Sequence, residues 1–112
     1  VKGLFISVGG DAHIRSWKWN STELIPAMPA VPAHIQAINS LVLSPCARYV
    51  ATGSMDKTIK IWDSATLQLL KVIDYPRYGG HKHSINTLIW SSYKDLLVSG
   101  SDDKQISVWK ID

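Results

Sequence analysis

Short runs of alternating apolar and polar residues, separated by turn-forming residues, cover most of the chain. A period of two is typical of β-strands whose two faces differ. In residues 58–63, Ile59 and Ile61 fall on one such face. Helical spacing would instead place polar side chains such as Lys60 and Asp63 on the same stripe as Ile59, so no window favours a helix. The pattern therefore predicts an all-β chain.

This strand pattern recurs along the chain. Residues 34–62 align without a gap on residues 81–109, at a constant offset of 47 positions. The N-terminal segment joins at an offset of 45, where Asp11 lies over Asp56 and Trp17 over Trp62. Self-similarity with a period of about 20 to 50 residues is typical of repeat architectures. Identical residues in the two longer copies include His34/His81, Asn39/Asn86, Gly53/Gly100, Asp56/Asp103 and Trp62/Trp109.

Each repeat is expected to form short antiparallel strands joined by polar turns. Pro45, which fixes its own φ angle, marks the turn after the first strand of the middle repeat. The tight polar turns are expected around Asp56 and Asp103. The predicted strands are 38–44, 49–54, 58–63 and 67–74 in the middle repeat, and 85–91, 96–101 and 105–111 in the last.

A His ahead of the first strand and a Trp-Asp pair that closes the third resemble the WD-repeat family. Gly80-His81 and Trp62-Asp63 carry these features, although Ala33 replaces the usual Gly, and Lys18 and Lys110 follow their Trp where Asp is usual. The resemblance covers nearly the whole chain. It implies a WD-repeat β-propeller, in which four-stranded antiparallel blades are arranged radially about a central channel.

The strands divide the chain into one complete and two incomplete blades. Residues 3–33 supply three strands, residues 34–74 a complete blade, and residues 81–111 a blade that lacks its outer strand. Full propellers hold at least about four blades. We therefore expect the C-terminal part of a larger propeller, with the remaining blades supplied by the parent chain or by self-association.

The resemblance also implies a buried hydrogen-bond chain in each blade, in which Asp accepts from His, His contacts Ser or Thr, and that hydroxyl contacts the Trp indole. A Ser-His-Asp catalytic site is the alternative, but a triad has no reason to be copied in every blade. These structural tetrads comprise His34, Thr52, Asp56 and Trp62 in the middle repeat, His81, Ser99, Asp103 and Trp109 in the last, and Ser7, Asp11 and Trp17 in the first, whose His would precede residue 1.

Neither a metal site nor a phosphate site is predicted, and no cofactor is expected. His81-Lys82-His83 offers two imidazoles, whereas zinc normally takes three or four protein ligands. Gly9-Gly10-Asp11 is not followed by a helix that could present its amides to a phosphate.

Residues 74–83 are the least repetitive part of the chain and lengthen one connection between blades. Tyr and Arg are enriched in binding hot spots, so we expect this loop to contact a protein or peptide partner. Packing of both tyrosines on the blade is the alternative. The partner-binding candidates are Tyr75, Arg77 and Tyr78, joined on the same face by Gln36, Met55, Lys57, Lys82, His83, Asp102 and Lys104.

Composition narrows the function further. With 46% apolar and 19% charged residues the chain is globular, and it has no apolar run long enough for a membrane span. A net charge of +3 gives no argument for nucleic acid, and a single cysteine, Cys46, suits a reducing compartment such as the cytoplasm. The leading prediction is a non-catalytic scaffold for protein–protein interaction. The alternatives are a regulatory or sensor domain of a larger multidomain protein, a propeller enzyme, and binding to nucleic acid or to an anionic surface through the lysines.

Overall fold

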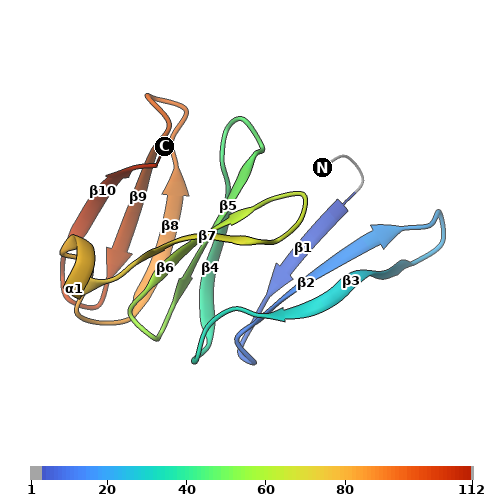
Figure 1. Ribbon diagram of the computed structural model, residues 1–112, viewed down its shortest axis with the longest axis horizontal. Coiled ribbons are helices and arrows are strands. Elements are labelled where there is room, and N and C mark those ends of the chain that lie inside the picture. The colour runs from blue at the N-terminus through green and yellow to red at the C-terminus, as the bar shows by residue number, and fades with distance from the viewer. Residues whose placement is uncertain (1–3, 112) are drawn as a thin grey trace.

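The computed structural model describes residues 4–111, which form ten strands in three antiparallel sheets and one short helix. The sheets follow one another along the chain and lie side by side like the leaves of a fan (Figure 1). The first has the order β1 (Leu4–Val8), β2 (His13–Trp19), β3 (Leu24–Pro32). The second is β4 (Ile38–Leu43), β5 (Tyr49–Ser54), β6 (Ile59–Asp63), β7 (Leu69–Ile73), and the third is β8 (Ile85–Trp90), β9 (Leu96–Ser101), β10 (Ile106–Lys110).

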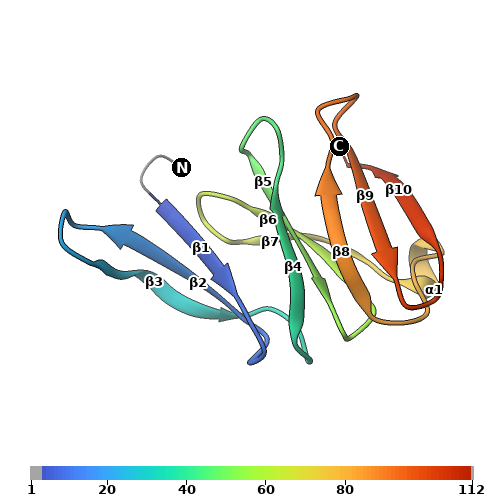
Figure 2. The same ribbon diagram turned by 180° about the vertical axis from the view of Figure 1, so that it is seen from behind.

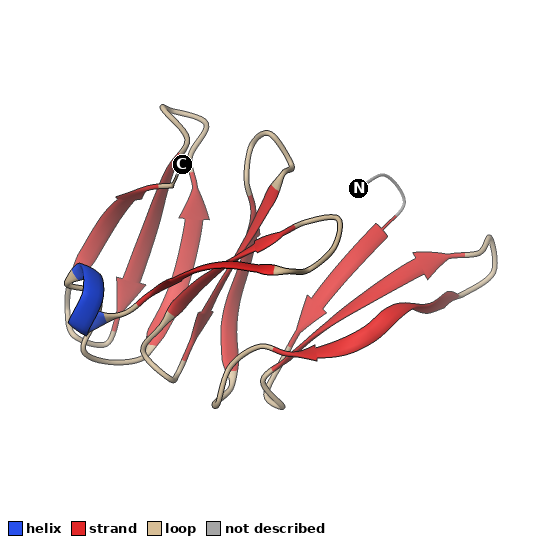
Figure 3. Ribbon diagram, in the orientation of Figure 1, coloured by secondary structure: helices blue, strands red, loops and turns tan. Residues whose placement is uncertain are grey.

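Each sheet is a simple meander in which sequential strands pair, as short turns between antiparallel strands require (Figure 3). The strand register places rows of apolar residues on both faces of the second sheet. Val42, Ala51 and Ile61 lie opposite one another in one row. Val50 and Trp62 lie in the next row, which faces the other way. The second sheet therefore has two apolar faces.

Both faces of this sheet are buried against its neighbours, which gives two cores (Figure 2). Ile59 and Ile61 pack with Ile85, Leu88 and Leu97 of the third sheet. On the other side, the second sheet packs on the first through a cluster of Ile14, Ala33, Ile38, Val50, Trp62 and Leu67. Burial of this apolar area, at about 25 cal/mol per Å², is the main force that holds the sheets together.

The all-β propeller-blade fold predicted from the sequence is confirmed, with three sheets of three or four strands. The strands 49–54 and 96–101 have the predicted bounds. Each of the other strands in these two repeats is one to three residues shorter than predicted. The expectation that no segment is helical is wrong at one place, α1 (Tyr75–Tyr78). This segment contains a single helical turn, too short to show a helical period in the sequence.

Candidate functional site

In the middle tetrad, a continuous chain of hydrogen bonds connects the segment before β4 with the β5–β6 turn and with strands β5 and β6. His34 Nδ1 lies 2.8 Å from Asp56 Oδ2, and His34 Nε2 lies 2.8 Å from the hydroxyl of Thr52. The indole Nε1–H of Trp62 donates to the same hydroxyl at 2.9 Å. Thr52 is fully buried, and a buried indole needs such an acceptor.

The last repeat reproduces this arrangement with a serine in place of the threonine. His81 Nδ1 lies 2.9 Å from Asp103 Oδ2, and His81 Nε2 lies 2.7 Å from Ser99 Oγ. Trp109 Nε1–H donates to Ser99 Oγ at 2.9 Å. Two repeats with the same geometry and different hydroxyl residues indicate a structural relay that ties the strands of each sheet together.

The first repeat has only the outer link of this relay. Trp17 Nε1–H donates to Ser7 Oγ at 2.9 Å. Asp11 pairs with the guanidinium of Arg15 at 2.7 Å and accepts from the backbone N–H of His13. Within residues 4–111, no hydrogen bond joins Asp11 to Ser7 or Trp17.

The tetrad carboxylates are held in their charged form. Burial acts to raise the pKa of Asp103, but the hydrogen bond with His81 and those from the Lys82 and Gln105 amides outweigh it and lower that pKa to about 2. Asp56 is subject to the same opposition, since burial raises its pKa while hydrogen bonds with His34 and Thr58 lower it well below the ordinary value. Both carboxylates therefore stay ionised as acceptors.

Three further hydroxyl side chains support the tetrads in a role that was not predicted from the sequence. Ser54 Oγ donates to the carbonyl of Ala37 at 2.8 Å and accepts from the Asp56 N–H at 3.0 Å. Ser101 accepts from the Asp103 N–H at 3.2 Å in the same way. Their identity in the two aligned repeats was a visible signal. Thr58, which donates to Asp56 Oδ1 at 2.6 Å, has no counterpart in the last repeat and gave none.

The partner-binding candidates lie at the end of the sheets that carries the Asp turns, which we call the loop face. Gln36, Met55, Lys57, Lys82, His83, Asp102 and Lys104 are all exposed there. Backbone hydrogen bonds hold these turns together, since Met55 N–H donates to Ala37 O at 2.9 Å and Asp102 N–H to Ser84 O at 3.1 Å. The loop face is the lower edge in Figure 1, with α1 at its left end.

The short helix α1 is fixed at both ends. Asp74 caps its start by accepting from the Arg77 N–H at 3.0 Å, and Gly79 ends it in the left-handed region at φ 65°. None of its residues is buried, and Tyr75 and Tyr78 are each 50% exposed. Each tyrosine is therefore half covered by the rest of the chain and half open to solvent, which is compatible both with packing on the blade and with contact to a partner.

A pocket of about 290 Å³ opens beside α1, between the β5–β6 turn and the segment 74–82. The Lys82 ammonium lies 4.9 Å from the centre of the Tyr75 ring and thereby holds one wall of this pocket. The remaining lining side chains are charged or polar, apart from Pro76. The pocket thus combines an aromatic ring with groups of both charges.

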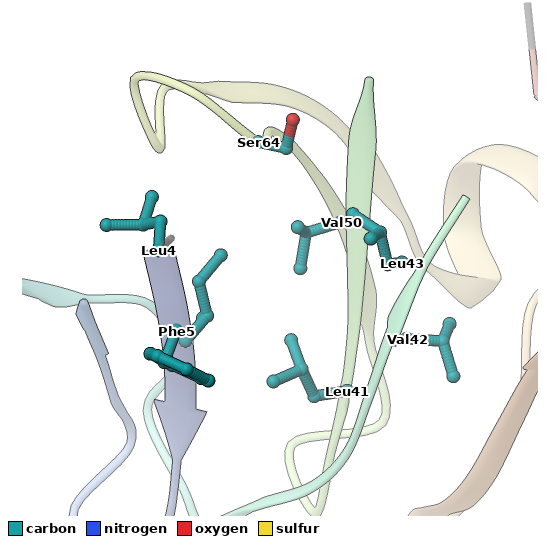
Figure 4. Close-up of a pocket in the computed structure, with 8 residues that line it drawn as sticks. Leu4, Phe5, Leu41, Val42, Leu43, Val50 and Ser64 are labelled. Atoms are coloured by element: carbon teal, nitrogen blue, oxygen red, sulfur yellow. The ribbon is translucent and has the colours of Figure 1, made fainter. Parts of the chain in front are cut away.

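A second pocket, of about 340 Å³, lies between the first two sheets (Figure 4). Its walls are apolar side chains such as Leu4, Leu41 and Val50, with Ser64 as the one polar residue among those that line it. None of its lining side chains is titratable, so the Ser64 hydroxyl, which donates to the carbonyl of Ala47, has no base beside it in this pocket. Among residues 4–111, no group of three or more His, Cys, Asp and Glu could hold a metal ion, and no helix is long and apolar enough to cross a membrane.

Three small antiparallel sheets lie side by side, and an Asp–His–hydroxyl–Trp relay ties together the strands of the second and third; these features define a blade-repeat protein of the β-propeller class. The family model described as "WD domain, G-beta repeat" matches residues 28–63 and 72–110. The chain belongs to this WD40 family, as its sequence resemblance indicated.

Individual relatives agree with this membership. The chain is 34% identical over 74 residues to Superkiller complex protein 8 of Dictyostelium discoideum, which covers 65% of this chain and 25% of that protein. The chain thus spans about a quarter of this relative's length. The computationally designed Ika4 protein matches with a TM-score of 0.78 at 28% identity, over 100% of this chain and 62% of that one. The WD40 repeats of RRP9 match with a TM-score of 0.79 at 26% identity, over 97% of this chain and 32% of that one.

Proposed function

We propose that this chain is a non-catalytic scaffold that binds a protein or peptide through its loop face. WD40 repeats generally serve as protein-interaction scaffolds, and the name of the Dictyostelium relative places that protein in a complex. Fold alone does not fix function, so the proposal depends on the site itself.

The exposure of α1 is the observation that carries the proposal. An aromatic pair and an arginine stand out from the surface on a helix that is capped at both ends, so that little conformational entropy is lost when a partner binds. Exposed Tyr and Arg are the residue types that dominate binding energy in interfaces. The neighbouring pocket, with the Tyr75 ring and the Lys82 ammonium in its wall, would accept a partner side chain.

The same observations weigh against an enzyme on this face. The His, Asp and hydroxyl groups are engaged in the buried tetrads, where His34 and His81 are both buried. The remaining exposed groups of the loop face lack a nucleophile paired with a base. Their mixture of polar and aromatic side chains suits recognition of a partner protein. We also propose that the protein meets this partner in the cytoplasm.

A comparative affinity purification tests this assignment. The variant Tyr75→Ala/Arg77→Ala/Tyr78→Ala should reduce recovery of bound proteins by about tenfold or more, because truncation of hot-spot residues costs over about 1 kcal/mol each. Trp19→Ala is the matched control, since Trp19 is also a largely exposed aromatic residue, at 56%, but lies at the end of β2 in the first sheet. Equal recovery of partners by the α1 variant and the control would contradict the proposal.

A further inference from the structure

A third pocket lies at the opposite end of the sheets from α1, and its chemistry differs from that of the loop face. It has a volume of about 540 Å³ and is formed by the β4–β5 turn, the β8–β9 turn and the end of β10 (upper edge in Figure 1). Tyr49 and Trp90 form its aromatic part, with ring centres 6.4 Å apart and planes inclined by 14°. The pocket therefore lies between the second sheet and the third.

Three cationic side chains surround this aromatic pair. Arg48, Lys94 and Lys110 line the pocket, and Asp95 is the one carboxylate that lines it with them. In the part of the chain that the structure describes, none of the three cations forms an ion pair with a carboxylate. The pocket thus carries an excess of positive charge, with three cations against the one carboxylate that lines it, while the carboxylate of Asp63 also acts electrostatically on Arg48.

Contacts within the chain hold the walls of this pocket in place. The Arg48 guanidinium lies over the Tyr49 ring at 5.4 Å, and Trp90 Nε1–H is already satisfied by the carbonyl of Asp95 at 3.0 Å. The nearby carboxylate of Asp63 accepts from the amides of its own turn, Ala65 and Thr66, at 2.8 and 2.9 Å. The walls are therefore organised, while the charged ends of the side chains stay exposed.

From this combination we infer that the pocket binds an acidic peptide segment of a partner protein, as a second interaction surface independent of the loop face. Carboxylates of the peptide pair with Arg48 and Lys110, and its apolar atoms lie on the Tyr49–Trp90 pair. A nucleic acid is disfavoured, because single strands are bound along a groove of many cations, whereas here three cations and a carboxylate bound one pocket.

The one cysteine of the chain provides a built-in reporter for this pocket. Cys46 lines it and is exposed. A hydrogen bond with Ser44, followed by one from the Arg48 amide, lowers the pKa of the Cys46 thiol and makes it more reactive near neutral pH. Labelling of this thiol reports the charge of the pocket and its occupancy without any effect on the loop face.

The experiment compares two thiol reagents on the full chain at low salt. The dianionic reagent dithionitrobenzoate should react faster than a neutral dipyridyl disulfide relative to a free thiol standard, by about tenfold, the lower end of electrostatic steering. Arg48→Gln/Lys110→Gln should abolish this preference. The matched control Arg15→Gln/Lys18→Gln removes the same charge, one arginine and one lysine, from β2 and should keep it.

Occupancy is then measured as protection of Cys46 from the neutral reagent. A hexaglutamate peptide should slow labelling of the natural chain and of the control, but not of Arg48→Gln/Lys110→Gln. Absence of protection, or equal loss of protection in the control, overturns the inference. Equal protection by inorganic phosphate at the same concentration would show a simple ion site and would also overturn the inference. Stronger protection by an oligothymidylate than by the hexaglutamate peptide would overturn it in favour of a nucleic acid. Loss of partners by the α1 variant bears only on the loop face, so the two proposals fail separately.

Discussion

The imidazole of His34 and the carboxylate of Asp56 meet at 2.8 Å although 22 residues separate them in the chain. Both side chains are almost fully removed from solvent. The contact ties the segment before β4 to the β5–β6 turn. A buried polar group deprived of its partner costs its desolvation free energy, so this pair is a point where a single substitution should destabilise the second sheet.

Asp56→Ala should therefore lower the free energy of unfolding by about 1–3 kcal/mol, because His34 and Thr58 both lose their acceptor. Chemical denaturation followed by tryptophan fluorescence measures the change. Asp11→Ala is the control, since Asp11 stands at the equivalent position of the first repeat but lies exposed, and its removal should change stability little. Equal effects of the two substitutions would contradict a structural role for the tetrad.

The tetrad carboxylates also predict how stability depends on pH. The pKa of Asp103 is about 2 in the folded chain, below the ordinary value of 3.8. A lowered folded pKa means that the unfolded state takes up protons first, so the contribution of Asp103 is complete above about pH 4 and is lost as the pH falls towards about 2. Thermal unfolding between pH 7 and pH 2 should show a smaller acid-induced fall of Tm in Asp103→Asn than in the natural chain. A similar fall in both would contradict the assignment.

The sequence predicted most of the fold because its information is repeated. The first three strands of the second sheet each have an aligned copy in the third, so alternation, turn residues and the tetrad positions support one another. The tetrad members were predictable from the family resemblance. Their supporting side chains were not predicted. The Ser54/Ser101 identity marks a shared position but does not reveal its backbone partners, and Gln105 stands in the last repeat where the middle repeat has Thr58.

The segment that differs most from the sequence prediction is also the one that lacks a copy. Residues 74–80 have no aligned counterpart, and their helical turn arises from local capping by Asp74 and Gly79. The pocket around Tyr49 and Trp90 was not predicted from the sequence, for a different reason. Its residues come from two turns and a strand end that are brought together only when the second and third sheets pack.

Gly53 allows this close packing of the second and third sheets. A Cβ atom added there would lie 2.5 Å from Ile85 Cγ2 and 3.1 Å from Ile85 Cβ. Because Ile85 is fully buried, it cannot move aside, and Gly53→Ala should lower the free energy of unfolding by about 1–3 kcal/mol. Gly10→Ala serves as control, since a Cβ at Gly10 meets no atom within 4 Å. Urea denaturation of both variants measures the difference, and an unchanged midpoint for Gly53→Ala would show that the sheets can separate at no cost.

The two caps of α1 should control binding at the loop face without affecting the cores. Asp74→Ala removes the acceptor of the Arg77 N–H, at a local cost of about 1 kcal/mol. Gly79→Ala forces a side chain into the left-handed region at φ 65°, at a similar cost of about 1–2 kcal/mol. No atom lies within 4 Å of a Cβ at Gly79, so the second effect is conformational strain alone.

Because α1 contributes no buried residue, both variants should keep the near-ultraviolet circular dichroism of the tryptophan-rich cores while they weaken recovery of loop-face partners. Hydrogen exchange of the Arg77 and Gly79 amides would rise in these variants. Faster exchange with full partner recovery would mean that the helical turn is not required for binding.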